Sequence, residues 1–401
     1  MRLELVASEN HVSLAQLQAC GSQMENVTVE GYPGRRFLGS SVHVDALEQL
    51  AVDRARRLFG AGFANVQPHS GTQANQAVML ALLQPGDTVL SMRLCDGGHF
   101  SHGDAANLSG ALYQAVFYGV GADGCIDYLE VDRLARAHAP KLLIAGASAY
   151  PRAIDFARMA EIAHGVGAHL MADIAHVAGL VASGLFPHPL PHADVVTTTT
   201  YKNLRGPRGG LILCNDESLA QRIDIALCPL LQGTPIMGLI AAKAVAFGEA
   251  LAPGYADYSR SVLANARVLA DRFSANGFRV VTGGTDTPFV VLDLRPLGLN
   301  GKVAASCLDT CSIGANAVPV PGDADFEHAS GLRLGVSALT TRGFGPQECE
   351  SVADLVSQAL QDLASGEPDA HKLATLTKHV TALCERFPIY SGSDGWSGSG
   401  L

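Results

Sequence analysis

Short apolar runs alternate with helical patterns through the first two-thirds of the chain, and this alternation constrains the fold most. Runs of strand length stand at 141–148, 168–176, 194–200 and 209–215. Patterns with apolar residues at helical spacing stand at 44–60, 76–87 and 154–167. Strands and helices in this order form a mostly parallel sheet with helices on both faces. Ligands of such α/β sheets bind beyond the carboxyl ends of the strands.

The C-terminal part of the sequence predicts a smaller α+β unit. A long helical pattern covers 236–276, and the runs FRVVTGG, PFVVLDLRP and GLRLGVSALTTRG follow it. We therefore expect a large domain over 1–255, which includes the N-terminal segment, and a small domain over 256–388. The Gly/Ser-rich residues 389–401 are expected to be a disordered tail.

Composition excludes several classes of function. Of the 401 residues 48% are hydrophobic and only 16% are charged, which allows a large core. The net charge of -10 is spread without long acidic runs and argues against nucleic acid as a partner. Nine scattered cysteines form no CxxC pair, so neither a disulfide framework nor a metal site is expected.

The sequence also indicates a cytoplasmic protein. The N-terminal MRLELVASEN has no basic segment followed by an apolar run, so no signal peptide is expected. The longest uncharged apolar stretch, 225–242, has the length of a membrane span. Prolines and glycines interrupt it, and we interpret it as a buried loop that enters a helix.

A single lysine, Lys202, follows the strand-like run of threonines in TTTTYKNLRGPRGG. A lysine at the end of a buried strand is costly unless it is paired or its pKa is lowered. Lysines with a lowered pKa form Schiff bases with aldehydes. A lysine that reaches solvent from a loop is the alternative, and on this residue alone it is the better interpretation.

Three further elements favour a bound cofactor. Ser70, Gly71 and Thr72 precede a helix, where backbone N–H groups bind phosphate, although an ordinary helix cap would look the same. Asp173 ends a buried strand and can pair with a protonated ring nitrogen or cap a turn. His99, in the loop GGHFSHG, can stack on a flat ring. Together these groups meet the needs of pyridoxal 5'-phosphate (PLP).

The chain resembles the serine hydroxymethyltransferase family of fold-type I PLP enzymes over nearly its whole length. The motifs that carry the resemblance are LVASEN, EGYPGRR, NVQPHSGTQAN, GGHFSHG, GASAYPR, ADIAHVAGLVASG, TTTTYKNLRGPRGG and ALTTRG. The resemblance implies a large domain with a mostly parallel sheet of seven strands and a smaller C-terminal α+β domain.

The resemblance also assigns roles to residues of the cofactor site. Lys202 binds the aldehyde of PLP, Asp173 pairs with the pyridine nitrogen, and His99 stacks on the ring. The remaining cofactor contacts it implies are Ser70, Gly71, Thr72, Ser148, His176, Thr199 and Thr234.

For the substrate, the resemblance implies that Arg333 clamps the amino-acid carboxylate with help from Ser8 and His176. Glu30 handles a proton at the substrate hydroxyl and comes from the neighbouring subunit. Such sharing implies a homodimer with composite sites, or a higher oligomer built from it. Leu94, Gly97, Gly98 and Asn316 match folate-contacting positions.

Several residues depart from the family pattern at the substrate and folate mouth. These departures are Thr28, Phe37, Leu38, Phe100, Tyr201, Thr234 and Gly238. They favour a specialised member that cleaves serine or threonine and passes the glycine unit to another aldehyde, an L-threonine transaldolase-like activity. A genuine serine hydroxymethyltransferase with tetrahydrofolate is the alternative, and a non-catalytic paralogue is an alternative of another class.

Overall fold

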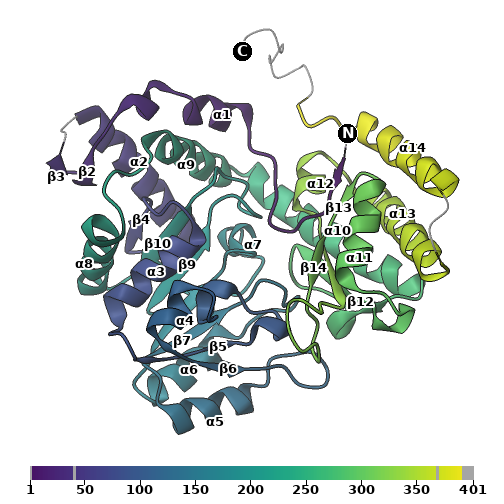
Figure 1. Ribbon diagram of the computed structural model, residues 1–401. Helices are drawn as coiled ribbons and strands as arrows, with labels where there is room; N and C mark the ends of the chain where they lie inside the picture. The colour runs from purple at the N-terminus through teal and green to yellow at the C-terminus, as the bar shows by residue number, and fades with distance from the viewer. Residues whose placement is uncertain (1, 39–41, 367–369, 391–401) are drawn as a thin grey trace. The chain divides into compact units, whose positions relative to one another are not determined.

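The computed structural model describes residues 2–38, 42–366 and 370–390 (Figure 1). The chain divides into two compact units. The larger consists of Ala15–Ser148 and Ala153–Ala256, and the smaller of Met1–Leu14, Ala149–Arg152 and Asp257–Leu401. The expected domain boundaries at 255 and 388 stay predictions, to which the structure adds that Met1–Leu14 belong with the C-terminal unit. Residues 391–401 of the expected tail lie outside the described residues.

The larger unit is built on a seven-stranded sheet. In spatial order its strands are β4 (Phe63–Asn65), β10 (Gly210–Cys214), β9 (Val195–Thr199), β8 (His169–Asp173), β7 (Leu142–Gly146), β5 (Thr88–Met92) and β6 (Gln114–Tyr118). All pairs from β9 to β6 are parallel, whereas β10 is antiparallel to both β9 and β4. The mostly parallel α/β sheet that the sequence predicts is therefore confirmed.

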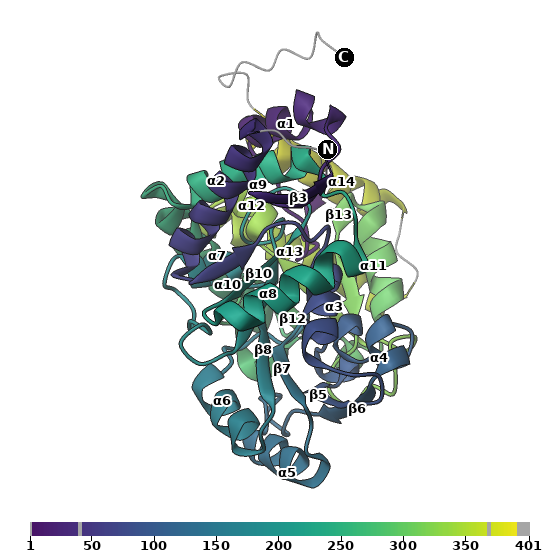
Figure 2. The same ribbon diagram turned by 90° about the vertical axis from the view of Figure 1, so that its left-hand side faces the viewer.

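Both faces of the central strands are buried, because every residue of β7, β9 and β10 is inaccessible to solvent. On β7, Leu142 and Ile144 belong to a core cluster that includes residues of α3 (Gly71–Leu82) and α8 (Glu217–Ile225). Leu143 points the other way and is also fully buried. Two neighbouring helices, α5 (Tyr128–His138) and α6 (Phe156–Gly165), pack against β5–β8 (Figure 2).

The remaining helices of the larger unit are shorter or lie beside the sheet edge. The longest of them, α2 (Val42–Phe59), packs along α9 (Met237–Ala250) (Figure 1). The others are α1 (Leu14–Cys20), α4 (Leu108–Leu112) and α7 (Ala178–Ala182).

The interrupted apolar stretch at 225–242 is a short irregular helix, a loop and the start of α9. The irregular part covers Ala226–Leu231 and contains Pro229, and the loop leads to Met237. Among the described ranges no single helix is long and apolar enough to cross a membrane; α9 and α10 (Gly254–Ala275) meet that test only as a bent pair. Pro253, which cannot continue a helix, stands between these two helices.

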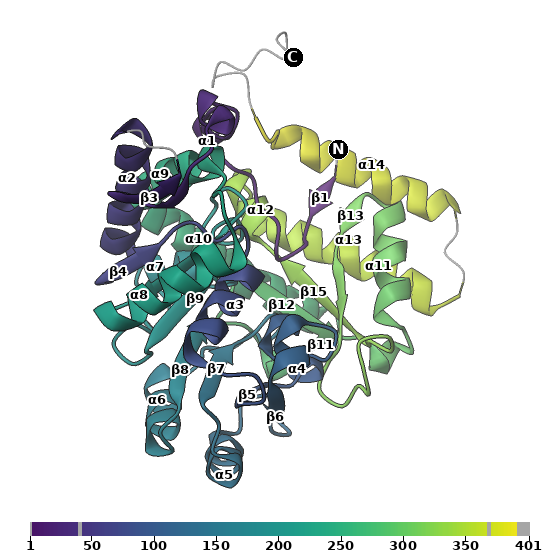
Figure 3. The same ribbon diagram turned by 60° about the vertical axis from the view of Figure 1, so that its left-hand side comes forward.

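The smaller unit contains an antiparallel sheet with helices packed on it (Figure 3). Its strands run in the order β11 (Arg279–Val280), β12 (Phe289–Asp293), β15 (Gly331–Gly335) and β14 (Asn316–Val318). A separate parallel pair joins β1 (Leu3–Glu4) to β13 (Ile313–Gly314). The helices are α11 (Gly301–Thr310), α12 (Ser337–Thr341), α13 (Pro346–Ala364), α14 (Ala370–Arg386) and most of α10. One continuous apolar core joins them.

Leu143→Ala tests the packing of the central sheet. Leu143 is fully buried in β7, so its loss leaves a cavity, and we expect the free energy of unfolding to fall by about 2–5 kcal/mol. Leu129→Ala is the matched control, because Leu129 is 74% exposed on α5 and its loss is expected to change that free energy by about 0.5 kcal/mol or less. Urea unfolding of both variants measures the difference, and equal effects would contradict the assigned packing.

Candidate active site

Lys202 is buried at the carboxyl edge of the large sheet, three positions after the end of β9. Only 7% of the residue is exposed. Its Nζ lies 2.9 Å from Nε2 of His176, which follows the neighbouring strand β8. The alternative of a lysine that reaches solvent is therefore wrong, because parallel strands bring the segments after β8 and β9 together inside the fold.

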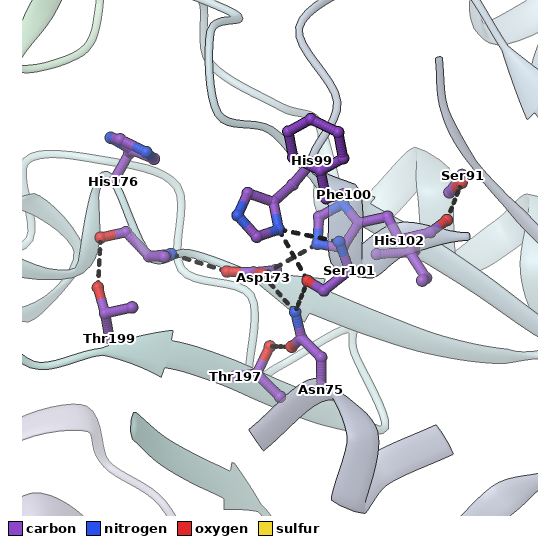
Figure 4. A network of polar contacts seen from close by, with 12 residues as sticks. Asn75, Ser91, His99, Phe100, Ser101, His102, Asp173, His176, Thr197 and Thr199 are labelled. Atoms are coloured by element: carbon purple, nitrogen blue, oxygen red, sulfur yellow. Dashed lines mark hydrogen bonds and ion pairs between the residues drawn. The ribbon is translucent and has the colours of Figure 1, made fainter. Parts of the chain in front are cut away.

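Asp173, the last residue of β8, lies in a network of hydrogen bonds (Figure 4). Its Oδ2 accepts a hydrogen bond of 2.8 Å from Nδ2 of Asn75 and lies 3.0 Å from Nε2 of His102. Its Oδ1 accepts from the backbone N–H of Ala175 at 3.0 Å. These contacts hold the carboxylate in one orientation.

The same network keeps Asp173 ionised. Burial raises the pKa of its carboxyl, but the hydrogen bonds and charge from His102, together with the hydrogen bond from Asn75, outweigh burial and hold that pKa well below its usual range. The structure thus places a persistent negative charge at this edge of the sheet. A carboxylate of this kind stabilises a protonated pyridine nitrogen.

His99 is oriented by the loop that carries it. Its Nδ1 lies 2.7 Å from Oγ of Ser101 and accepts from the backbone N–H of the same residue at 3.2 Å. Ser101 Oγ also accepts from Asn75 Nδ2 at 2.9 Å, which links the loop to the Asp173 network. The ring is therefore held in a defined orientation next to that network (Figure 4).

The loop before α3 provides a cradle for an anion. Ser70 is the N-cap of this helix, and its Oγ accepts from the backbone N–H of Gln73 at 3.1 Å. The first N–H groups of a helix have no partner within the helix and bind phosphate well. A Cβ on Gly71 would lie 2.7 Å from Cγ2 of Thr199, so the helix start approaches β9 closely only because that position is glycine.

One pocket of the larger unit collects most of the predicted cofactor residues. Those that line it are Ser70, Gly71, Thr72, His99, Ser148, Asp173, His176, Thr199 and Lys202. Lysine, ionised carboxylate, oriented imidazole and helix start are the groups that an aldehyde, a pyridine ring and a phosphate require. The residues present therefore fit PLP.

Other predicted residues do not line this pocket. Glu30 is on the hairpin of β2 (Glu30–Tyr32) and β3 (Arg35–Leu38), where its carboxylate lies against Gly233. The backbone of Thr234 hydrogen-bonds His69, the residue before Ser70.

The predicted folate positions Leu94 and Gly98 lie outside the pocket lining too. Backbone contacts explain why Gly97 and Gly98 stand at these positions. The carbonyl of Gly97 accepts from the N–H of Ser148 at 2.7 Å, and a Cβ on Gly98 would lie 2.2 Å from the carbonyl oxygen of Met92.

The smaller unit holds Ser8, Arg333 and Asn316. Nη2 of Arg333 donates to Oδ1 of Asn316 at 3.0 Å, and these residues face each other across the paired strands β15 and β14. Burial lowers the pKa of Arg333 to about 10, so the guanidinium keeps its charge at neutral pH. Ser8 lies in the turn after β1. The substrate roles of these residues stay predictions.

Sequence reasoning missed the residues that support Asp173. Asn75 contacts Ser101 and Asp173 through Nδ2, and its Oδ1 accepts from Thr197 Oγ1 at 2.6 Å. His102 is in the loop GGHFSHG, but neither the sequence pattern nor the resemblance gives it a role. Two signals were available in the sequence. Asn75 is a polar residue on the buried side of α3, and Thr197 is a polar residue in the middle of the buried strand β9.

Two departures from the expected family pattern have local consequences. Tyr201 lines the pocket beside Lys202, and the guanidinium carbon of Arg208 lies 4.5 Å from the centroid of its ring. A Cβ on Gly238 would lie 2.3 Å from Oε1 of Glu25 and 2.5 Å from the carbonyl oxygen of Cys20, so no larger residue fits without a shift.

Phe37 and Leu38, on β3, are 65% and 53% exposed. Among the described residues, no three His, Cys, Asp or Glu side chains are placed to hold a metal ion.

Comparisons with known proteins agree with this geometry. The family model for serine hydroxymethyltransferase matches residues 1–356. The chain belongs to the serine hydroxymethyltransferase family. It is 55% identical to a serine hydroxymethyltransferase of Rhodospirillum centenum and 54% identical to one of Acidiphilium cryptum, in each case over 97% of this chain and 91% of the relative. It is 54% identical to one of Sphingopyxis alaskensis over 98% of this chain and 91% of that relative.

Membership of this family makes PLP the cofactor and gives the chain the fold-type I class that its sequence indicated. It also places the chain among transferases of serine, glycine and one-carbon metabolism. The pocket around Lys202 is the part of the fold that fits PLP, as its lining residues show.

His102→Asn tests the control of the charge on Asp173. It removes a contact that lowers the pKa of Asp173, so that pKa should rise toward or above the usual value of about 3.9. A carboxyl group with a lowered pKa is charged at neutral pH. It loses this charge only when the pH falls through the pKa that it has in the folded protein. We therefore expect the variant to lose PLP at a higher pH than the wild type during acid titration.

His164→Asn is the matched control for that titration. Nε2 of His164 lies 3.0 Å from Asp194, the same distance as in the His102–Asp173 pair, but His164 is not in the pocket lining. Its acid profile, followed by the visible absorption of bound PLP, is expected to match that of the wild type. Coincident profiles for all three proteins would contradict the role of His102.

Proposed function

We propose that this chain is a serine hydroxymethyltransferase that moves the hydroxymethyl carbon of serine to tetrahydrofolate and leaves glycine. The observation that carries the proposal is the identity of 50–55% to proteins with that name over 97–98% of the chain. An intact set of cofactor residues around Lys202 supports it and argues against the non-catalytic paralogue. The comparisons thus favour hydroxymethyl transfer over the transaldolase activity that the substitutions suggested.

In this proposal, residues of the larger unit bind and orient the cofactor. Bound PLP supplies an electron sink that makes cleavage at the amino-acid Cα feasible. Lys202 holds its aldehyde, and Asp173 keeps the ring nitrogen protonated because its own carboxylate stays ionised. His176, which contacts Nζ of Lys202 at 2.9 Å, is placed to exchange a proton with that amine. Ser70 and the N-terminus of α3 hold the phosphate.

Recognition of the amino acid is assigned to Arg333 and Ser8. The guanidinium of Arg333 is buried and charged, and a planar fork of this kind binds a carboxylate with two parallel hydrogen bonds. Phe289 lies under the guanidinium, with 5.9 Å between the Arg333 carbon and the ring centroid. These contacts leave the arginine oriented before substrate arrives.

The proposal includes a homodimer in which Glu30 serves the site of the neighbouring subunit. Glu30 is absent from the described lining of its own pocket, and the hairpin that carries it presents the exposed apolar side chains of Phe37 and Leu38. A carboxylate on such a hairpin can complete a second copy's site. The dimer, the proton role of Glu30 and a cytoplasmic location are predictions.

Transfer of the glycine unit from threonine to another aldehyde is a second candidate. The observation that favours it is Tyr201, which lines the pocket beside Lys202 and is stacked under Arg208. This pair puts a phenol ring and its hydroxyl in the pocket next to Lys202. The second candidate differs from the first only in the acceptor, because both need the same cofactor residues.

A paired assay distinguishes the acceptors. Purified holoenzyme is given serine with tetrahydrofolate in one reaction and threonine with an added aldehyde, without folate, in the other. We expect folate-dependent formation of glycine to be at least about tenfold faster in kcat/KM than formation of a new β-hydroxy amino acid, a difference of about 1.4 kcal/mol in transition-state stabilisation. The opposite ratio would reject hydroxymethyl transfer as the main activity.

The family pattern that the chain resembles has histidine at the position of Tyr201, so Tyr201→His reports whether this departure sets the acceptor. If Tyr201 adapts the pocket to an aldehyde, the variant gains folate-dependent rate and loses transfer to the aldehyde. If it is a neutral filler, as the first proposal requires, both rates change together by about threefold or less, which corresponds to about 0.65 kcal/mol. Tyr201→Phe is the control, because it removes only the hydroxyl and retains the ring under Arg208.

A further inference from the structure

Lys243, on α9, is a second buried lysine that the reaction does not use. It is 2% exposed, and its Nζ donates to three backbone carbonyl oxygens. The distances are 2.6 Å to Val66, 3.1 Å to Pro68 and 2.9 Å to Gly210. Three acceptors use all three N–H bonds of an ammonium group, so this geometry fits the charged form.

The three acceptors belong to the frame of the phosphate cradle. Val66 and Pro68 lie in the segment between β4 and α3, and His69 separates Pro68 from Ser70. Gly210 begins β10 and donates its own N–H to the carbonyl of Pro68 at 2.8 Å. The ammonium therefore fastens the segment that leads into the cradle to the strand beside it.

Glycines in the motif RGPRGG leave the room that this arrangement needs. A Cβ on Gly209 would lie 2.3 Å from Cε and 2.6 Å from Nζ of Lys243. A Cβ on Gly210 would lie 2.3 Å from the carbonyl oxygen of Ser70. Gly209 therefore leaves room for the side chain of Lys243, and Gly210 leaves room for the backbone of Ser70 in the cradle.

The charge of Lys243 has no direct counter-ion among the described residues. Its partners are neutral carbonyls, and no carboxylate forms an ion pair with it in those ranges. Burial lowers the pKa of Lys243 to about 7, and the charge of Glu48 opposes that shift. Glu48 itself is paired with Arg36 at 2.7 Å. An anion bound at the start of α3 would add the missing negative charge.

We propose that Lys243 is a positioning residue that fixes the segment Val66–Pro68 against Gly210 and places a positive charge behind the phosphate cradle. Its effect is on the phosphate group of PLP and not on the aldehyde or the ring. The inference rests on PLP as cofactor but not on the identity of the one-carbon acceptor.

A comparison of PLP with pyridoxal, which lacks the phosphate, tests this proposal. The full-length apoprotein of the wild type and of Lys243→Met is titrated with each compound, and binding is followed by visible absorption. The ratio of the pyridoxal dissociation constant to the PLP dissociation constant measures what the phosphate contributes. We expect this ratio to fall by at least about tenfold in Lys243→Met, with little change in pyridoxal affinity.

Phe247→Leu is the matched control, because Phe247 is fully buried on α9, four positions after Lys243. Its ratio is expected to stay within about twofold of the wild-type value. A similar fall of the ratio in Phe247→Leu would mean that disturbed core packing causes the effect, and it would overturn the proposal. Equal loss of PLP and pyridoxal affinity in Lys243→Met, or no loss, would overturn it too.

Gly209→Ala provides an independent variant if Lys243→Met does not fold. It retains the lysine but puts a methyl group in the space of Cε and Nζ. The same selective fall in the ratio is expected, and an unchanged ratio would contradict the proposal. The measurement uses neither serine nor folate, so its failure is distinguishable from failure of the proposed function.

Discussion

The side chain of Asn75 joins the parts of the site that come from different elements. From α3 it donates to Asp173 at the end of β8 and to Ser101 in the loop that carries His99. It accepts from Thr197 on β9. Because both amide atoms are used, the helix that begins with the phosphate cradle is fixed relative to the carboxylate and the imidazole. A single buried amide therefore sets the spacing between the protein groups at the start of α3 and those around Asp173.

Two buried lysines near this site illustrate how surroundings decide what a residue does. Lys202 lies at the pocket wall with a histidine nitrogen as neighbour, where an amine can exchange protons and react. Lys243 is enclosed by three carbonyl oxygens, where every N–H bond is committed and the amine cannot reach a ligand. Hydrogen-bond partners, and not burial alone, separate the reactive lysine from the structural one.

Much of the fold and the lining of the pocket could be predicted from the sequence. Apolar runs locate β7, β8, β9 and β10 to within a few residues, because strands buried on both faces have little choice of composition. The strands β4, β5 and β6 were not located by such runs. Lys202 was identified because it follows such a run, and Asp173 because it ends a strand within one. The start of α3 was placed too late, since the helix begins at Gly71, five positions before the predicted start at residue 76.

Contacts between distant segments could not be predicted in the same way. Asn75 and Thr197 are 122 positions apart, and no local pattern indicates that they meet. Lys243 has the appearance of an ordinary lysine on a helix, and only the packed fold shows its carbonyl partners. Gly238 is among the departures from the family pattern, and only the structure shows its steric reason beside Glu25 and Cys20.

Reduction with borohydride followed by peptide mapping tests the central claim most directly. In protein saturated with PLP, reduction makes the link between cofactor and amine permanent, and mass spectrometry identifies the modified peptide. The account predicts that the peptide containing Lys202 carries the cofactor mass and that the peptide containing Lys243 does not. An unmodified Lys202, or a label on Lys243, would contradict the assignment of the two lysines.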